Sequence, residues 1–235
     1  MQIYGKNVAI ERLNSNEKIK KIYLSNKFND DKIISLIKKK NIITKVLDNR
    51  ELDKMCKGLH QGIILEVEDI KTYELEEVLS SIDKEYPLLV ILDHLEDPHN
   101  FGAIIRSSEA FGVDAIIVPN DRSVQITSTV VKTSVGTIEK MKIVKVVNLN
   151  NTIKKLKEYG YWIVGTDMEG EDYTSVDYKT KIAVVIGNEG KGISRLVSEN
   201  CDYLAKIPMK GTVNSLNASV ACGIFLSEIV RSRGN

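Results

Sequence analysis

Residues 207–231, IPMKGTVNSLNASVACGIFLSEIVR, decide how the C-terminal half of this chain can fold. A short apolar strand ending at Pro208 leads into a loop rich in Gly, Ser and Asn, and the helix that follows carries no charge before Glu228. A helix that is apolar on every side must be covered on every side, so we expect it to pack against its own sheet and a second subunit. The loop offers free N–H groups at a helix N-terminus, which suits a polar ligand. This stretch alone favours the simpler reading, a buried helix with a polar cap.

The composition is typical of a globular protein that does not depend on disulfide bonds. The chain has 235 residues and a net charge of +1. It contains no apolar run of membrane-spanning length, and its N-terminus MQIYGKNV lacks the apolar core of a signal peptide. Cys56, Cys201 and Cys222 lie far apart and in no metal-ligand spacing, which indicates reduced thiols. We therefore expect a soluble cytoplasmic protein.

Positive charge is concentrated at the N-terminal end of the chain. Residues 1–45 hold 11 Lys or Arg against 4 Asp or Glu, a local net charge of +7. A basic segment of this kind favours binding to a polyanion such as RNA. A solvated charged face explains the same excess equally well, so the charge alone does not decide between them.

Hydrophobic periodicity predicts an α/β protein in two parts. Residues 1–70 alternate between helical and strand-like patterns and predict a small three-layer domain, residues 71–86 a linker with one surface helix, and residues 87–235 a mostly parallel sheet. In the first part the helices are expected at 3–13, 30–40 and 51–56, and the strands at 21–25, 43–47 and 62–67. In the last part the strands are expected at 87–95, 115–119, 139–147, 161–167, 181–186 and 203–208, and helices at 97–112, 127–134, 152–160 and 193–200.

The predicted helix at 97–112 combines a buried stripe with a polar side. Gly102 and Arg106 are four residues apart and share a face off that stripe, while Asn100 sits where an N-cap belongs. A Gly beside an Arg leaves room for a phosphate or a ribose, although a solvated Arg is the common alternative. The helix follows the C-terminal end of a parallel strand, where ligands gather in such sheets. The stripe consists of Phe101, Ile104, Ile105, Ser108 and Phe111.

Two further polar segments flank predicted strands. DHLEDPHN, residues 93–100, is rich in Asp and His but lacks metal-ligand spacing, so we do not expect a metal site there. GNEGKGIS, residues 187–194, fails as a Walker A loop because Gly192 follows Lys191. What remains is a glycine turn whose N–H groups can face a ligand, with Glu189 in its middle, or else a plain strand-to-helix turn.

Taken together, three of these segments resemble a known family. NFGAIIRSSEAFG (100–112), VVIGNEGKGIS (184–194) and IPMKGTVNSLNASVACG (207–223) are similar, in order and spacing, to the three motifs of the SpoU/TrmH family of RNA ribose 2′-O-methyltransferases. The N-terminal IYGKNVAIERL and the later HQGIILEV resemble that family's substrate-binding domain, which is similar to small RNA-binding ribosomal proteins. With this domain attached, the chain most resembles the members that methylate a guanosine ribose in 23S rRNA.

The resemblance implies a fold that periodicity would not predict. The family has an α/β-knot (SPOUT) domain whose C-terminal segment is threaded through a loop as a trefoil knot, whereas the strand pattern alone predicts an unknotted sheet. It also implies a homodimer and a pocket for S-adenosylmethionine, the methyl donor, with no metal. Carried over to this sequence, the pocket would be formed by Thr166, Gly187, Asn188, Gly190, Ile207, Met209 and Leu216.

The resemblance further implies a set of catalytic residues around the ribose. Arg106 matches the arginine proposed to activate the 2′-hydroxyl, but a guanidinium stays protonated near neutral pH and makes a poor base. We expect its fork to grip a phosphate and to stabilise the forming alkoxide. The residues expected to shape the site around it are Asn100, Glu189, Ser215, Asn217 and Ser219.

Other functions stay open at this point. A tRNA ribose methyltransferase is the nearest alternative, although the minimal tRNA enzymes generally lack the attached basic domain. A resistance methyltransferase that targets an adenosine is a further relative. A non-catalytic RNA-binding knot protein would have no need to keep Asn100, Arg106, Glu189 and Asn217.

Overall fold

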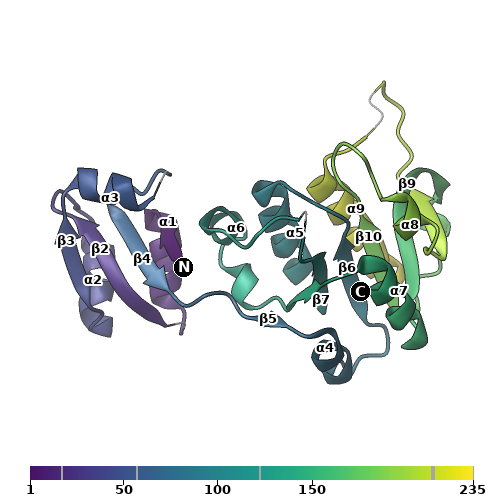
Figure 1. Cartoon of the computed structure of the whole chain (residues 1–235), viewed down its shortest axis with the longest axis horizontal. Coiled ribbons are helices and arrows are strands. Elements are labelled where there is room, and N and C mark those ends of the chain that lie inside the picture. The colour runs from purple at the N-terminus through teal and green to yellow at the C-terminus, as the bar shows by residue number, and fades with distance from the viewer. Residues whose placement is uncertain (17, 57, 122, 213–214, 235) are drawn as a thin grey trace.

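The computed structural model describes residues 1–16, 18–56, 58–121, 123–212 and 215–234. The described residues form two sheets, one in an N-terminal unit (residues 1–67) and one in a C-terminal unit (residues 72–234), which Figure 1 shows side by side. The two units also touch: Arg12 forms an ion pair with Glu139, and Glu11 lies against Gly136. The described residues contain no helix that is long and apolar enough to cross a membrane.

The N-terminal unit is built on a four-stranded sheet with the strand order β1-β4-β2-β3. The central strand β4 runs antiparallel to β1 and β2, whereas β2 and β3 are parallel. The strands are β1 (Gln2–Tyr4), β2 (Ile19–Ser25), β3 (Thr44–Leu47) and β4 (Ile63–Val67), and the helices are α1 (Lys6–Asn14), α2 (Asp31–Lys40) and α3 (Asn49–Met55).

Alternation along β4 divides this unit into the three predicted layers. Ile63 and Leu65 belong to the core that includes α1 and α2, whereas Ile64 packs with Leu52 of α3 on the opposite face. The prediction of a helix over residues 3–13 was wrong at its start, because Ile3 pairs in β1. Gly5 has φ 101°, which only glycine adopts easily, and this residue turns the chain from β1 into α1.

The C-terminal unit contains a seven-stranded sheet with the order β11-β9-β10-β6-β7-β8-β5, and all of its pairings are parallel. The strands are β5 (Thr72–Tyr73), β6 (Leu88–Leu92), β7 (Ala115–Pro119), β8 (Ile143–Val146), β9 (Trp162–Asp172), β10 (Ile182–Ile186) and β11 (Tyr203–Lys206). The helices are α4 (Leu75–Ser81), α5 (Pro98–Ala110), α6 (Ser128–Thr133), α7 (Leu149–Glu158), α8 (Arg195–Ser198) and α9 (Ala218–Ser232), with short 3-10 turns at Thr137–Glu139 and Tyr173–Ser175.

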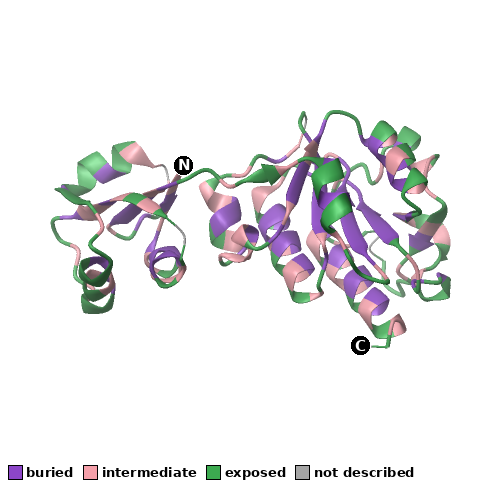
Figure 2. Cartoon of the chain, turned by 90° about the horizontal axis from the view of Figure 1, so that it is seen from below, coloured by how far each residue is buried: buried purple, intermediate pink, exposed green. Residues whose placement is uncertain are grey.

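The central strands are apolar because helices cover both faces of the sheet. Every residue of β6, β7 and β10 is buried, as Figure 2 shows by its purple strands. On one face, side chains of α5, α6 and α9 pack against Leu88, Val90 and Leu92. On the other face, side chains of α4, α7 and α8 pack against Leu89 and Ile91. This confirms the predicted parallel sheet covered by helices.

The structure departs from the predicted elements at the sheet's edges. Thr72 and Tyr73, expected in a linker, pair with β8 and extend the sheet. Strand β9 is longer than predicted, and its pairing with β11 jumps from Gly165 to Glu171, so that residues 166–170 stand outside the ladder. Strand β11 ends at Lys206 rather than at Pro208, which has no N–H to donate to a ladder.

Candidate functional site

A chain of side-chain hydrogen bonds links the three motif segments. Asn100 of α5 donates from Nδ2 to Oε1 of Glu189 in the glycine turn, at 2.8 Å. Asn217, just before α9, donates from Nδ2 to Oδ1 of Asn100, also at 2.8 Å. Asn100 is only 7% exposed, so both groups of its amide find partners where water hardly reaches. The structure thus brings together Asn100, Glu189 and Asn217, as predicted.

Asn217 is oriented by its second role as the N-cap of α9. Its Oδ1 accepts from the backbone N–H of Ser219 at 2.9 Å and of Val220 at 3.3 Å, and from the Ser219 hydroxyl at 2.6 Å. These donors determine which end of the amide is the oxygen, so Nδ2 must point toward Asn100. Ser219 therefore joins the cluster through Asn217, and we call Asn100, Glu189, Asn217 and Ser219 the relay cluster.

The predicted N-cap of α5 was wrong. Asp97, not Asn100, caps the helix, because Pro98 takes the first helical position, where a missing N–H costs nothing. The Asp97 carboxylate accepts from the N–H groups of His99 at 3.0 Å and of Asn100 at 3.4 Å. With the cap supplied by Asp97, the side chain of Asn100 is free to enter the relay cluster.

The glycine turn after β10 is closed by its own backbone. Asn188 and Gly192 exchange two N–H···O bonds of 2.9 Å, and Asn188 Oδ1 accepts from the N–H of Gly190 at 3.0 Å. A Cβ on Gly187 would overlap the backbone of Gly192, so this close approach requires glycine. The closure leaves Glu189 exposed at the tip, where it meets Asn100.

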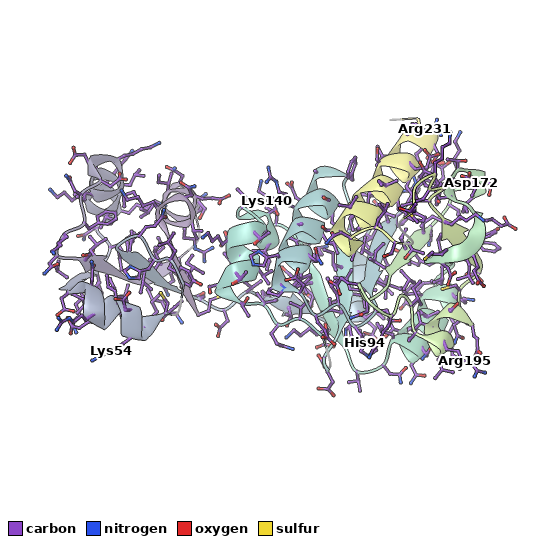
Figure 3. All side chains as sticks on the ribbon, turned by 90° about the horizontal axis from the view of Figure 1, so that it is seen from above. Lys54, His94, Lys140, Asp172, Arg195 and Arg231 are labelled. Carbon is purple, nitrogen blue, oxygen red and sulfur yellow. The ribbon has the colours of Figure 1, made fainter. Side chains whose placement is uncertain are left out.

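Asp93 anchors the same turn and was not among the predicted site residues. Its carboxylate is 1% exposed and accepts from the N–H of Ser194 at 2.6 Å, while its other oxygen lies 2.5 Å from Nδ1 of His94. His94 has φ 57°, and its carbonyl accepts a hydrogen bond from Asn188 Nδ2 at 3.0 Å. Figure 3 labels His94 in the C-terminal unit. An Asp ending a fully apolar strand was the sequence signal for this anchor.

Asp97 and His99 of the same segment also make structural contacts. Asp97 caps α5, and the Thr133 hydroxyl lies 3.5 Å from Nδ1 of His99. Within the described residues no three side chains of His, Cys, Asp or Glu come together in a way that could hold a metal ion.

The residues expected to form the pocket lie beyond three neighbouring strands. Strands β11, β9 and β10 are adjacent and parallel, so their C-terminal ends meet at the same edge of the sheet. That edge carries half-buried Thr166 in the excursion of β9, the glycine turn after β10, and half-buried Ile207 and exposed Met209 after β11. In the loop before α9, Leu216 is half-buried and Ser215 is exposed. Residues 213 and 214 of this loop are outside the residues that the structure describes.

Arg106 stands apart from the relay cluster in the single chain. It is exposed and lies six residues further along α5 than Asn100, about 9 Å along the helix axis. In the described parts of the chain, no hydrogen bond or ion pair joins it to the cluster. Its charge instead acts on Glu11: burial raises the pKa of the Glu11 carboxyl, and the charges of Lys140 and Arg106 oppose this rise. Lys140 faces the N-terminal unit in Figure 3.

The expected role of Gly102 was also wrong. We predicted that it leaves room for a phosphate or a ribose, but it is buried against α6. A Cβ at this position would lie 2.6 Å from the Cβ of Thr133 and 3.0 Å from the carbonyl oxygen of Val130. Gly102 therefore allows two helices to approach closely.

Helix α9 is covered on one side only. Cys222, Phe225, Leu226 and Ile229 are buried, whereas Val220 is 49% exposed. The uncovered side borders a shallow groove of about 430 Å³ between α5 and α9. Its lining runs from Ser219 of the relay cluster to Ser107, the neighbour of Arg106, and includes Tyr173, Val220, Gly223, Ile224, Ser227 and Glu228.

Comparison with known proteins gives this geometry a family. The model of the SpoU rRNA Methylase family matches residues 87–227, and a model described as RNA 2′-O ribose methyltransferase substrate binding matches residues 2–73. YacO of Bacillus subtilis, whose name refers to TrmH family tRNA/rRNA methyltransferases, is 42% identical over 98% of this chain and 95% of its own length. The Coxiella burnetii protein named 23S rRNA (guanosine-2′-O-)-methyltransferase RlmB is 44% identical over 92% of this chain and 89% of its own length.

A solved structure supports the fold. The structure of AviRb from Streptomyces viridochromogenes, described as a SpoU methyltransferase in complex with AdoMet, superposes with a TM-score of 0.82. The superposition covers 99% of this chain and 90% of AviRb at 23% sequence identity. The two-unit α/β arrangement is therefore that of a known methyltransferase fold.

Proposed function

Because this chain belongs to the SpoU/TrmH family of RNA ribose 2′-O-methyltransferases, we propose that it methylates the 2′-hydroxyl of a guanosine ribose in 23S rRNA. The observation that carries the proposal is the relay cluster, in which Glu189, Asn100 and Asn217 from three distant segments are joined by two hydrogen bonds of 2.8 Å. The likeness to a guanosine methyltransferase over 92% of this chain supports the choice of substrate.

The methyl donor would lie at the shared edge of β9, β10 and β11. S-adenosylmethionine supplies a sulfonium methyl group that is already poised for transfer. The donor set fits such a molecule: half-buried Ile207 and Leu216 and exposed Met209 offer apolar surface for a base, and Thr166 offers a hydroxyl. Gly187, Asn188 and Gly190 bring backbone groups to the same edge in a turn that is already closed.

The relay cluster would position the ribose. Each of its side chains is held by a neighbour, so the cluster is ordered before substrate arrives, and order of this kind lowers the entropic cost of alignment. The Glu189 carboxylate is exposed, and its Oε1 accepts a hydrogen bond from Asn100 Nδ2. A carboxylate can accept several hydrogen bonds, so Glu189 can also accept one from a ribose hydroxyl. Ser215 and Ser219 add hydroxyls to the same loop and helix start.

Arg106 would act on the phosphate of the target nucleotide and on the oxygen that becomes negative during transfer. Its planar fork matches a phosphate with two parallel hydrogen bonds, and its charge persists at neutral pH. Since Arg106 lies outside the relay cluster of its own chain, we propose a homodimer that packs on the groove between α5 and α9 and completes the site. The uncovered Val220 side of α9 supports this interface.

The division of labour between the two units is part of the proposal. Residues 1–70 would bind RNA, residues 71–86 would link the units, and residues 87–235 would form a knotted methyltransferase domain. The basic excess of residues 1–45 favours RNA as the ligand. An rRNA substrate also implies a cytoplasmic enzyme.

A tRNA ribose is the second substrate to test, because YacO's name refers to both tRNA and rRNA. The decisive experiment measures S-adenosylmethionine binding by calorimetry and then methyl incorporation into 23S rRNA and into tRNA, followed by mapping of the methylated nucleotide. Incorporation at a guanosine ribose of 23S rRNA is the expected result. Labelling of tRNA alone would refute the substrate, and binding of RNA without any methyl transfer would refute the activity.

A further inference from the structure

The N-terminal unit contains a cleft that the methyl-transfer site does not use. It has a volume of about 430 Å³ and lies between the start of α1 and the turn that joins β2 to α2. Its lining includes Lys6, Lys27, Phe28, Leu59, Asn29 and Gln61, together with the carboxylate of Asp53.

The floor of the cleft is preformed by a turn of two left-handed residues. Gln61 has φ 52° and Gly62 has φ 81°. This backbone places Oε1 of Gln61 where it accepts from the N–H of Lys6 at 2.9 Å, the first residue of α1. A Cβ on Gly62 would lie 3.1 Å from Cδ2 of Phe28, so glycine lets the ring pack directly on the turn.

His60, paired with Asp53, stabilises this turn through its imidazole ring. Nδ1 of His60, a residue 9% exposed, accepts from the N–H of Gly62 at 2.9 Å. Nε2 of His60 lies 3.0 Å from Oδ1 of Asp53. Asp53 also lines the cleft, and its carboxylate is held by His60.

The cations are placed beside the apolar walls. Nζ of Lys6 lies 5.3 Å from the centroid of the Phe28 ring and 3.1 Å from Oδ2 of Asp30. Lys27 is exposed at the rim. Leu59 is 73% exposed and presents apolar surface to the cleft.

This combination matches the parts of a nucleotide whose base is unpaired. A base has apolar faces and polar edges, and it stacks on aromatic or apolar side chains once it leaves a helix. A phosphate suits the lysines, and the amides of Asn29 and Gln61 can bond to the base edge. A fully paired helix hides the faces of its bases and would present only phosphates.

We propose that this cleft binds an unpaired nucleotide of the RNA substrate, with the base between Leu59 and Phe28 and a phosphate beside Lys6 and Lys27. The inference rests on the RNA methyltransferase function proposed above and adds where the substrate is recognised away from the methylated ribose. Recognition then depends on an irregularity in the RNA rather than on a regular helix.

The test compares two labelled RNA hairpins of equal length, one with a fully paired stem and one with two bulged adenosines. Binding to the full-length protein is followed by fluorescence anisotropy. The main variant is Leu59→Ser, which removes exposed apolar surface and should leave thermal unfolding unchanged. We expect it to weaken binding of the bulged hairpin about fivefold or more and to leave the paired hairpin within twofold. Leu59→Phe should strengthen binding of the bulged hairpin.

The charge is tested by Lys27→Gln against a matched control. Lys39→Gln makes the same charge change near the far end of α2, about 12 Å along the helix from its start. Lys27→Gln should weaken binding of the bulged hairpin more than Lys39→Gln does. It should also reduce the slope of log affinity against log salt concentration by about one, the loss expected for one phosphate contact. Equal effects of the two variants would overturn the phosphate role.

Failure of this inference is distinguishable from failure of the methyltransferase function. Suppose that RNA is methylated and that Leu59→Ser binds each hairpin with the same affinity as the unchanged protein. That result would overturn the role of the cleft and leave the methyltransferase function standing. Loss of bulge-dependent binding in Leu59→Ser supports the cleft even where no RNA is methylated, which would refute only the activity. Calorimetry with S-adenosylmethionine should give the same affinity for Leu59→Ser, because the cleft lies outside the methyl-donor edge.

Discussion

The side-chain amide of Asn217 donates a hydrogen bond to the side-chain oxygen of Asn100 at 2.8 Å, across 117 positions of sequence. This bond ties the start of the last helix to the helix after β6, and Asn100 passes the connection on to Glu189. The same amide caps α9 with its oxygen, so one side chain sets both the helix start and the geometry of the cluster. Capping of α9 and assembly of the relay cluster are therefore coupled in this protein.

Replacing Asn100 should impair methyl transfer more than folding. Asn100→Ala removes the partner of both Glu189 and Asn217. If the hydrogen bonds that align the ribose are worth about 1–3 kcal/mol in the transition state, the rate falls about 5–150-fold. Asn100→Asp should reduce the rate further, because its carboxylate would face that of Glu189. Single-turnover methylation measures both. Asn151→Ala, an exposed asparagine on α7, serves as the control, and a normal rate for Asn100→Ala would exclude the relay cluster from catalysis.

Arg106→Lys separates charge from geometry. Lysine keeps the positive charge but lacks the planar fork, so we expect a single-turnover rate at least about tenfold lower at saturating S-adenosylmethionine. Arg195→Lys is the matched control, since Arg195 lies on the surface and pairs with Glu199 one helical turn away. If Arg106→Lys retains a near-normal rate, two-pronged phosphate binding is not its role.

Gly102→Ala should destabilise the fold through a steric contact rather than through chemistry. The added methyl would lie 3.0 Å from a backbone oxygen of α6 and 2.6 Å from the Cβ of Thr133, so the helices would have to move apart. Overpacking of this kind lowers the free energy of unfolding by about 1–3 kcal/mol. Chemical denaturation measures the change. Gly211→Ala, where no atom of the described residues lies within 4 Å of the new methyl, should leave the free energy of unfolding nearly unchanged.

Val220→Asp should convert the proposed homodimer to a monomer and abolish methyl transfer. It places a charge on the uncovered side of α9, where burial against a second copy would be costly. Sedimentation velocity reports the change in mass. Val147→Asp makes the same substitution at a position that is 89% exposed and outside the groove, and it should stay dimeric. A dimeric, active Val220→Asp variant would place the interface elsewhere.

Elements with a local signal could be placed from the amino-acid sequence. The apolar runs of β6, β7 and β10 require burial on both faces, and the stripe of Phe101, Ile104 and Ile105 requires a helix that covers them. The three motifs likewise identified the family and all four members of the relay cluster, because they carry side chains with specific chemistry in a fixed order. Those inferences depend on residues near one another in the chain.

The folded chain was needed to show which polar groups meet. Asp97 rather than Asn100 caps α5, and this choice releases Asn100 to bond with Asn217. Gly102 faces α6 and not a ligand, and Thr72 and Tyr73 join the sheet because β8 offers a free edge. Hydrogen bonds and close contacts between segments far apart in sequence depend on how helices and strands are packed, and periodicity within a segment carries no information about its partner.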